Sequence, residues 1–185
     1  MLATDDLKNE HLVVIRMLTI LESAVNKNAK DLPADFFSRT VDFLRNFVDK
    51  CHHGKEEEHL FPAMKAHGIS GKTGIIAVML AEHEQGRGLV RQIDEASKRI
   101  ATDRTAFETA IGSALEYTKL LQQHINKETN IAFPMADGVF TEDDNRELLE
   151  KFEEIEHERI GPGKHEGYLQ LIDELETALN IKSRV

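Results

Sequence analysis

Residues 51–64 read CHHGKEEEHLFPAM and place three histidines and three glutamates within eight positions. Residues 124–136, HINKETNIAFPMA, repeat the same skeleton. In both stretches a histidine is followed by a glutamate at i+4 and by a proline six residues later: His52, Glu56 and Pro62, then His124, Glu128 and Pro134. Residues four apart are neighbours on a helix, so each pair addresses a common point. The repeat therefore predicts a metal site with two similar halves.

The rest of the composition narrows the class of protein. The chain has 185 residues, a net charge of −10, no tryptophan and a single cysteine, Cys51. This length suits one domain with or without an appendage, and the charge argues against nucleic acid or an anionic membrane as a partner. One cysteine excludes an intrachain disulfide, and neither a signal peptide nor a spanning segment is recognisable. We expect a soluble, cytoplasmic protein.

Hydrophobic periodicity predicts an all-α protein. Four long helical patterns cover residues 1–138, joined by short connections, and predict an up-down-up-down four-helix bundle with the di-metal site inside. An acidic helix over 141–159, the break IGPGKHEG and a final amphipathic helix make up residues 139–185. We expect this part to be a C-terminal helical extension packed on the bundle.

Each predicted bundle helix carries one histidine on its apolar stripe, and two helices add a glutamate one turn later. The predicted metal ligands are His11, His52, Glu56, His83, His124 and Glu128. On the second helix an α-helical phase turns His52 and Glu56 inward and puts His53 and Glu57 on a solvent face. On the fourth helix the same phase turns Ile131 and Met135 inward. In the third, Gly86 and Gly88 allow a close approach of another helix or a ligand.

Four imidazoles and two carboxylates suit two borderline metal ions, and iron fits this mixture better than calcium or copper. The absence of ligand cysteines argues against an iron–sulfur cluster. Any one of these histidines alone would be read as an ordinary core residue. Burying all six titratable groups without a metal would cost several kcal/mol, which favours the metal site.

These residues resemble the hemerythrin-like, HHE cation-binding family. The matching pieces are NEHLVVI around His11, HHGKEEEHLFP around His52, AEHEQGR around His83 and HINKETNIAFP around His124. The resemblance implies a four-helix bundle around a non-haem di-iron centre, with the four histidines as terminal ligands and the two glutamates as bridges. It also implies a function in binding or sensing oxygen or iron, or in responding to nitric oxide and damaged iron–sulfur clusters.

The sequence departs from the oxygen-carrying hemerythrins at two positions. The carriers have a second histidine at i+4 after the third-helix histidine, where this chain has Arg87. Their last carboxylate is an aspartate at i+5, where this chain has Glu128 at i+4. Because a guanidinium cannot coordinate iron, we expect one iron to keep an open position for a diatomic ligand, and a function closer to the sensor and repair branch.

Three alternatives stay open at this point. A reversible oxygen carrier is one of them. A ferritin-like di-iron oxidase would use Glu-x-x-His pairs, which occur at residues 56–59 and 154–157; it alone needs His157. A metal-free structural module is the third. We further expect a monomer or homodimer, with oxygen or nitric oxide as the small-molecule partner.

Overall fold

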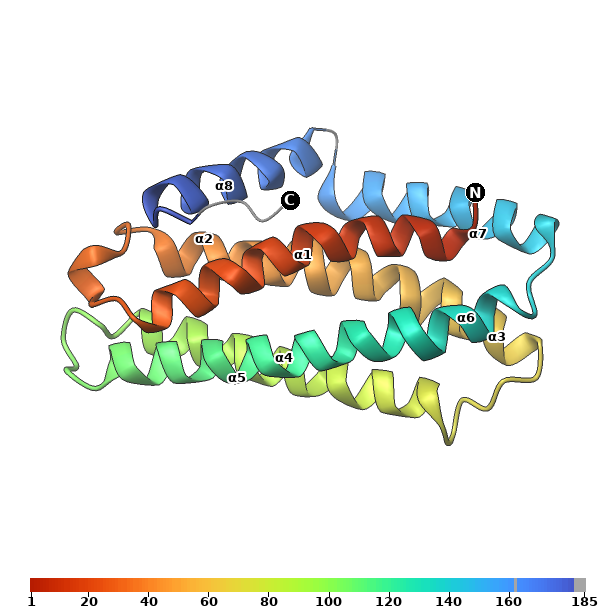
Figure 1. Ribbon diagram of the computed structural model, residues 1–185, viewed down its shortest axis with the longest axis horizontal. Coiled ribbons are helices and arrows are strands. Elements are labelled where there is room, and N and C mark those ends of the chain that lie inside the picture. The colour runs from red at the N-terminus through yellow and green to blue at the C-terminus, as the bar shows by residue number, and fades with distance from the viewer. Residues whose placement is uncertain (162, 182–185) are drawn as a thin grey trace.

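The computed structural model describes residues 1–161 and 163–181, and every regular element among them is helical (Figure 1). The predicted all-α class is thereby confirmed. The elements are α1 (Ala3–Val25), η1 (Ala29–Asp31), α2 (Phe36–Phe43), η2 (Leu44–His53), η3 (Glu56–Leu60), α3 (Phe61–Ala66), α4 (Ile75–Ser97), α5 (Ala106–Lys127), η4 (Glu128–Ala132), α6 (Phe133–Asp137), α7 (Glu142–Ile155), η5 (Glu156–Ile160) and α8 (Lys164–Ala178).

Four long helical segments lie side by side and form the body of the molecule (Figure 1). The first is α1 and the third is α4. The second runs without a break from α2 to α3, and the fourth from α5 to α6. None of the helices built from the described residues combines the length and the apolarity that crossing a bilayer demands.

The second and fourth segments contain π-helical stretches, η2, η3 and η4, where the sequence predicts α-helix. A π-turn closes i→i+5 hydrogen bonds and so rotates the following side chains relative to an α-helix. The predicted facing is wrong at two places as a result. His53 is buried at 4% exposure, whereas Ile131 and Met135 are 47% and 41% exposed.

Two apolar cores flank a buried polar layer along the bundle. On α1, Leu7 belongs to one core and Val14 to the other, and His11 lies between them. On the second segment, Cys51 and Leu60 bracket the histidine-rich stretch in the same way. The buried histidines therefore lie in one layer of the bundle, with hydrophobic side chains on both sides of it.

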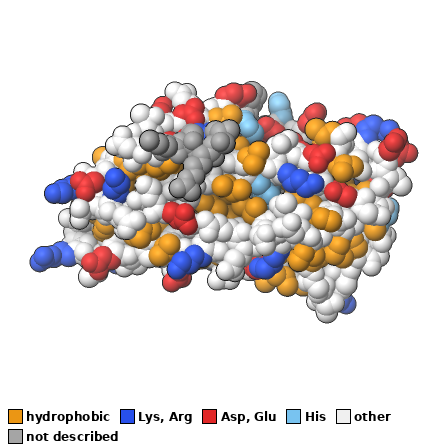
Figure 2. Space-filling view, viewed as in Figure 1, with side chains coloured by type: hydrophobic (Ala, Val, Ile, Leu, Met, Phe, Trp, Pro, Cys, Tyr) orange, Lys and Arg blue, Asp and Glu red, His pale blue; other side chains and the backbone are white. Residues whose placement is uncertain are grey.

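The C-terminal helices α7 and α8 pack along α1 and the second segment and contribute to both cores. Phe152 of α7 joins the core around Leu7, and Tyr168 of α8 joins the other and donates a hydrogen bond to Asp42 (3.1 Å). Hydrophobic side chains stand between charged ones on the face drawn in Figure 2. The predicted boundary after Gly138 falls between α6 and α7.

Candidate metal centre

All six predicted ligands meet in the buried layer, each at 3% exposure or less. Their metal-binding atoms fall into two groups, within each of which all atoms lie within 4.8 Å of one another. The groups are His11, His52, Glu56 and Glu128, and His53, Glu56, His83 and His124. The structure thus brings together every residue that the sequence singled out and adds His53.

The histidines face each other in two pairs through their Nε2 atoms. The distance from His11 Nε2 to His52 Nε2 is 3.1 Å, and that from His83 Nε2 to His124 Nε2 is also 3.1 Å. Two nitrogens bound to one metal ion at right angles, with bonds near ~2.1 Å, lie about 3 Å apart. Each pair therefore has the spacing of two ligands of a single ion.

The two glutamates lie between the pairs and address both. Glu128 places Oε2 3.1 Å from His11 Nε2 and Oε1 2.9 Å from His124 Nε2. Glu56 places Oε1 3.7 Å from His52 Nε2 and Oε2 3.4 Å from His83 Nε2. None of these four buried oxygens takes part in a well-formed hydrogen bond. Buried carboxylates are costly without a positive charge nearby, and two cations held between the imidazole pairs would supply that charge.

Carboxylates outside the centre hold three of the imidazoles by their other nitrogen. His52 Nδ1 donates to Glu10 Oε2 (2.7 Å), and His83 Nδ1 donates to Glu57 Oε1 (2.7 Å). His124 Nδ1 donates to Glu82 Oε2 (3.0 Å). A proton fixed on Nδ1 leaves the lone pair of Nε2 for a metal and makes the ring a better donor.

Sequence reasoning missed these outer carboxylates. The Glu-His dipeptide occurs at residues 10–11, 58–59, 82–83 and 156–157, and only the first and third of these are related by the internal repeat. At these two places the glutamate supports the histidine of a neighbouring helix, His52 or His124, rather than the histidine beside it. The internal repeat that relates His52 to His124 therefore extends to α1 and α4.

Lys55 balances the charge beside Glu10. It is fully buried, and its Nζ donates to Glu10 Oε1 (2.7 Å) and Asp6 Oδ2 (2.9 Å). Burial alone would raise the pKa of Glu10, but His52 and Lys55 outweigh it and lower that pKa to about 2. Glu10 is therefore ionised at neutral pH and fit to hold the Nδ1 proton of His52.

The carboxylates also set the protonation of the metal-free centre. Burial acts to lower the pKa of His52 and His83, but the surrounding glutamates raise it to about 9 and about 11. Burial likewise acts to raise the pKa of Glu128, and the facing histidines hold it well below its ordinary value. Without a metal, protons on the imidazoles supply the positive charge that the carboxylates need.

His53 was predicted on a solvent face, but the structure buries it. Its ring stacks on that of His83, with centroids 3.8 Å apart and planes at 14°. Neither of its ring nitrogens has a hydrogen-bond partner, and burial, followed by the neighbouring histidines, lowers its pKa well below the ordinary value. A neutral imidazole with a free lone pair on one ring nitrogen is a competent metal ligand. The structure therefore places a fifth imidazole beside the four from which an open iron position was predicted.

Arg87 occupies the position of the carriers' additional histidine. It forms ion pairs with carboxylates outside the centre. Its guanidinium donates to Asp49 Oδ1 (2.7 Å) and to Glu57 Oε1 (2.7 Å). Since Glu57 also accepts from His83, the arginine helps to orient an imidazole of the centre. Cys51 is buried among apolar residues, and burial raises its pKa to about 12.

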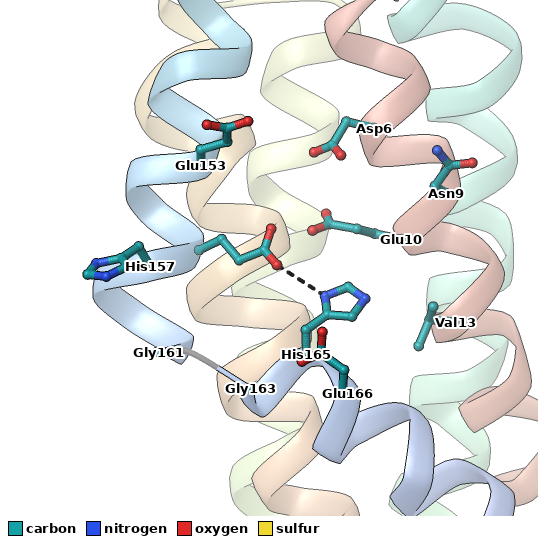
Figure 3. Close-up of a pocket in the computed structure, with 11 residues that line it drawn as sticks. Asp6, Asn9, Glu10, Val13, Glu153, His157, Gly161, Gly163, His165 and Glu166 are labelled. Carbon is teal, nitrogen blue, oxygen red and sulfur yellow. Dashed lines mark ion pairs between the residues drawn. The ribbon is translucent and has the colours of Figure 1, made fainter.

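The other histidines lie away from the centre. His157 is exposed and points outward from a cavity of about 570 Å³ beside α1 and α8, where His165 Nδ1 lies 3.3 Å from Glu156 (Figure 3). Glu10 separates this cavity from His52. His59 is half-buried on another surface hollow. These histidines and His67 belong to no group among the described residues that could hold a metal ion. The Glu-x-x-His spacings therefore form no ferritin-like site there.

Comparison with known proteins finds relatives of this chain. The chain is 27% identical over 182 residues to an uncharacterised protein of Mycobacterium tuberculosis (strain H37Rv), covering 97% of this chain and 71% of that protein. It is 33% identical over 88 residues to the iron-sulfur cluster repair protein YtfE of Salmonella typhimurium (strain LT2), covering 46% of this chain and 40% of that protein. No solved structure matches the chain.

The family model of the hemerythrin HHE cation binding domain matches residues 2–136, which include every histidine and glutamate of both ligand groups. The chain therefore belongs to the hemerythrin HHE cation-binding family.

Proposed function

We propose that the four long helical segments form an up-down-up-down bundle that binds two iron ions. One ion takes His11 and His52, the other takes His83, His124 and His53, and Glu56 and Glu128 bridge them. The observation that carries the proposal is the pair of 3.1 Å Nε2 spacings, with the carboxylates of Glu56 and Glu128 between them making no hydrogen bond. We propose oxygen or nitric oxide as the ligand, with neither nucleic acid nor membrane as a partner and a cytoplasmic monomer or homodimer as the working form.

Bound iron would supply one-electron oxidation and reduction, and the protein supplies the surroundings. Glu10, Glu57 and Glu82 hold the Nδ1 protons that orient the ligands. The apolar cores on either side of the buried layer limit the access of water to it. Together with the repair function in the name of the YtfE relative, this favours sensing of or reaction with a diatomic molecule, linked to damaged iron–sulfur clusters, over plain oxygen transport.

The test is the metal content of the reconstituted protein. Chain loaded anaerobically with excess ferrous iron and then desalted is expected to retain two ions, because each imidazole pair and both carboxylates need a cation. Mössbauer spectra should show two iron environments in equal amount. Tight retention of a single ion, or of none, would contradict the proposal.

His53→Ala is expected to weaken one iron ion selectively. The His53 imidazole lies only in the group with His83 and His124, so its loss should lower the affinity for the ion of that group. We expect a decrease of at least about 10-fold, because even residues that only hydrogen-bond to a metal ligand contribute that much. The other ion should stay. His59→Ala, a histidine on the same segment outside both groups, serves as the control. Identical iron titrations and spectra for the two variants would remove His53 from the ligand set.

A further inference from the structure

A small pocket of about 130 Å³ reaches inward between the second segment, α4 and α5. Its lining includes the buried residue His53 and the exposed side chains of Arg45 and Arg91. The remaining lining residues are Leu44, Asp49, Gly86, Arg87, Val90 and Tyr117. It is therefore a hollow that leads from the surface to the edge of the candidate metal centre.

Two polar groups in the pocket make no hydrogen bond. Both ring nitrogens of His53, a residue only 4% exposed, are without one, although Nδ1 lies 3.6 Å from Asp49 Oδ1. The hydroxyl of Tyr117, 2% exposed, makes no hydrogen bond to any residue in the described ranges 1–161 and 163–181. Burial raises the pKa of Tyr117, so the hydroxyl keeps its proton. The Tyr117 hydroxyl therefore has a proton to donate, and the pocket is where an acceptor would lie.

Gly86 keeps the pocket open. A glycine in the middle of a helix costs roughly 1 kcal/mol relative to alanine, and a Cβ here would lie 3.5 Å from the ring of Tyr117. The internal repeat that aligns His11 with His83 aligns Val14 with Gly86, and it aligns Ile125 with His53. Val14 is fully packed in the core. In the other half of the repeat, the side chain of Val14 thus fills the position that Gly86 leaves open.

The rim offers no net attraction to an ion. Arg45 pairs with Asp94 (2.7 Å), Arg91 with Glu84 (3.5 Å) and Arg87 with Asp49 and Glu57 (2.7 Å each). Each guanidinium is thus matched by carboxylates. Since a water molecule takes about 30 Å³ of liquid, a hollow of this size suits a molecule of a few heavy atoms, without charge.

We propose that this pocket is the access and holding site through which a small uncharged molecule reaches the side of the centre formed by His53, His83 and His124. The Tyr117 hydroxyl would donate a hydrogen bond to it there. This inference rests on the proposed function, because it takes the centre as its destination. It adds a route for the neutral diatomic ligand of the proposed function, and it makes the two half-sites unequal in their access to that ligand.

The first test fills the pocket. Gly86→Leu places a side chain in the hollow, whereas Gly112→Leu adds the same group on the exposed face of α5, where nothing lies within 4 Å of the added Cβ. Both variants should retain the iron content of the parent. In stopped-flow mixing with oxygen, reduced Gly86→Leu should react at least about 10-fold more slowly, and Gly112→Leu at the parental rate. Equal rates for all three proteins would overturn the route.

The second test needs no iron, so it separates failure of the route from failure of the proposed function. Dissolved oxygen is paramagnetic and speeds the relaxation of protons that it approaches. In the diamagnetic protein, zinc-loaded or metal-free, the Tyr117 ring and Gly86 signals should show enhanced relaxation under oxygen despite their burial. Gly86→Leu should lose the effect at Tyr117, and Gly112→Leu should keep it. Relaxation at Tyr117 no greater than at the equally buried Phe43 would overturn the proposal even if the protein binds two irons.

Discussion

Glu128→Ala is expected to reduce the iron content of the reconstituted protein from two ions per chain to one or none. Glu128 directs one oxygen toward His11 and the other toward His124, so a single substitution removes a ligand from both half-sites. Replacement of an outer ligand partner already weakens metal sites about 10–100-fold, and loss of a shared ligand should exceed about 100-fold. Iron titration followed by desalting and metal analysis measures the change.

The matched control is Glu58→Ala. Glu58 lies on the same helical segment as Glu56, is exposed and pairs with Arg159 at the surface, so its loss should leave both ions in place. A second comparison, Glu56→Ala, should resemble Glu128→Ala because Glu56 belongs to both ligand groups. Retention of two tightly bound ions by Glu128→Ala would show that this carboxylate is not a bridge.

The sequence predicted the fold class and the six converging residues for a physical reason. An amphipathic helix must bury its apolar stripe, so a histidine on that stripe goes inside with it. His11 and His83 lie on unbroken α-helices, where a period of 3.6 residues holds. His52 and His124 then follow from the repeat, since equivalent residues of similar helices are expected at equivalent depths.

The facing of residues next to the π-helical stretches could not be predicted in the same way. A π-turn is not signalled by composition, and its effect is to turn inward a residue that α-helical geometry leaves outside. His53 is buried as a result, and Ile131 is exposed although it lies one turn after a predicted ligand. The adjacent-histidine pattern at residues 52–53 was a signal for both side chains, but α-helical phase allows only one to face the core.

The outer carboxylates escaped prediction because they act between helices. Glu82 lies beside His83 in the sequence yet binds His124, and Glu57 binds His83 from another segment. Spacing along one chain segment cannot reveal such pairs. They follow only when the relative height of two helices is known, and the layer between the two apolar cores sets that height.

Removal of the metal is expected to lower the melting temperature of the protein by about 8–16 °C at neutral pH. A ligand at about 1,000 times its dissociation constant stabilises the folded state by about 4 kcal/mol, and 1 kcal/mol corresponds to about 2–4 °C in a chain of this size. Differential scanning calorimetry of anaerobic ferrous and chelator-treated protein measures the difference. Superimposable transitions would exclude a tightly bound buried metal.

The size of that difference should grow as the pH rises from 6 to 8. In the metal-free protein, the pKa values of His52 and His83 are raised to about 9 and about 11, above the ordinary value near ~6.5 of an unfolded chain. The stability that these protonated histidines contribute is therefore complete below pH ~6.5 and is lost as the pH climbs through the folded-state values. Iron binding reverses the dependence, because the ligand imidazoles must shed their protons to bind, and rising pH favours that exchange. Metal-free protein should thus melt lower at pH 8 than at pH 6, while the loaded protein should not. A difference that narrows with rising pH would mean that protons and iron do not compete for the same imidazoles.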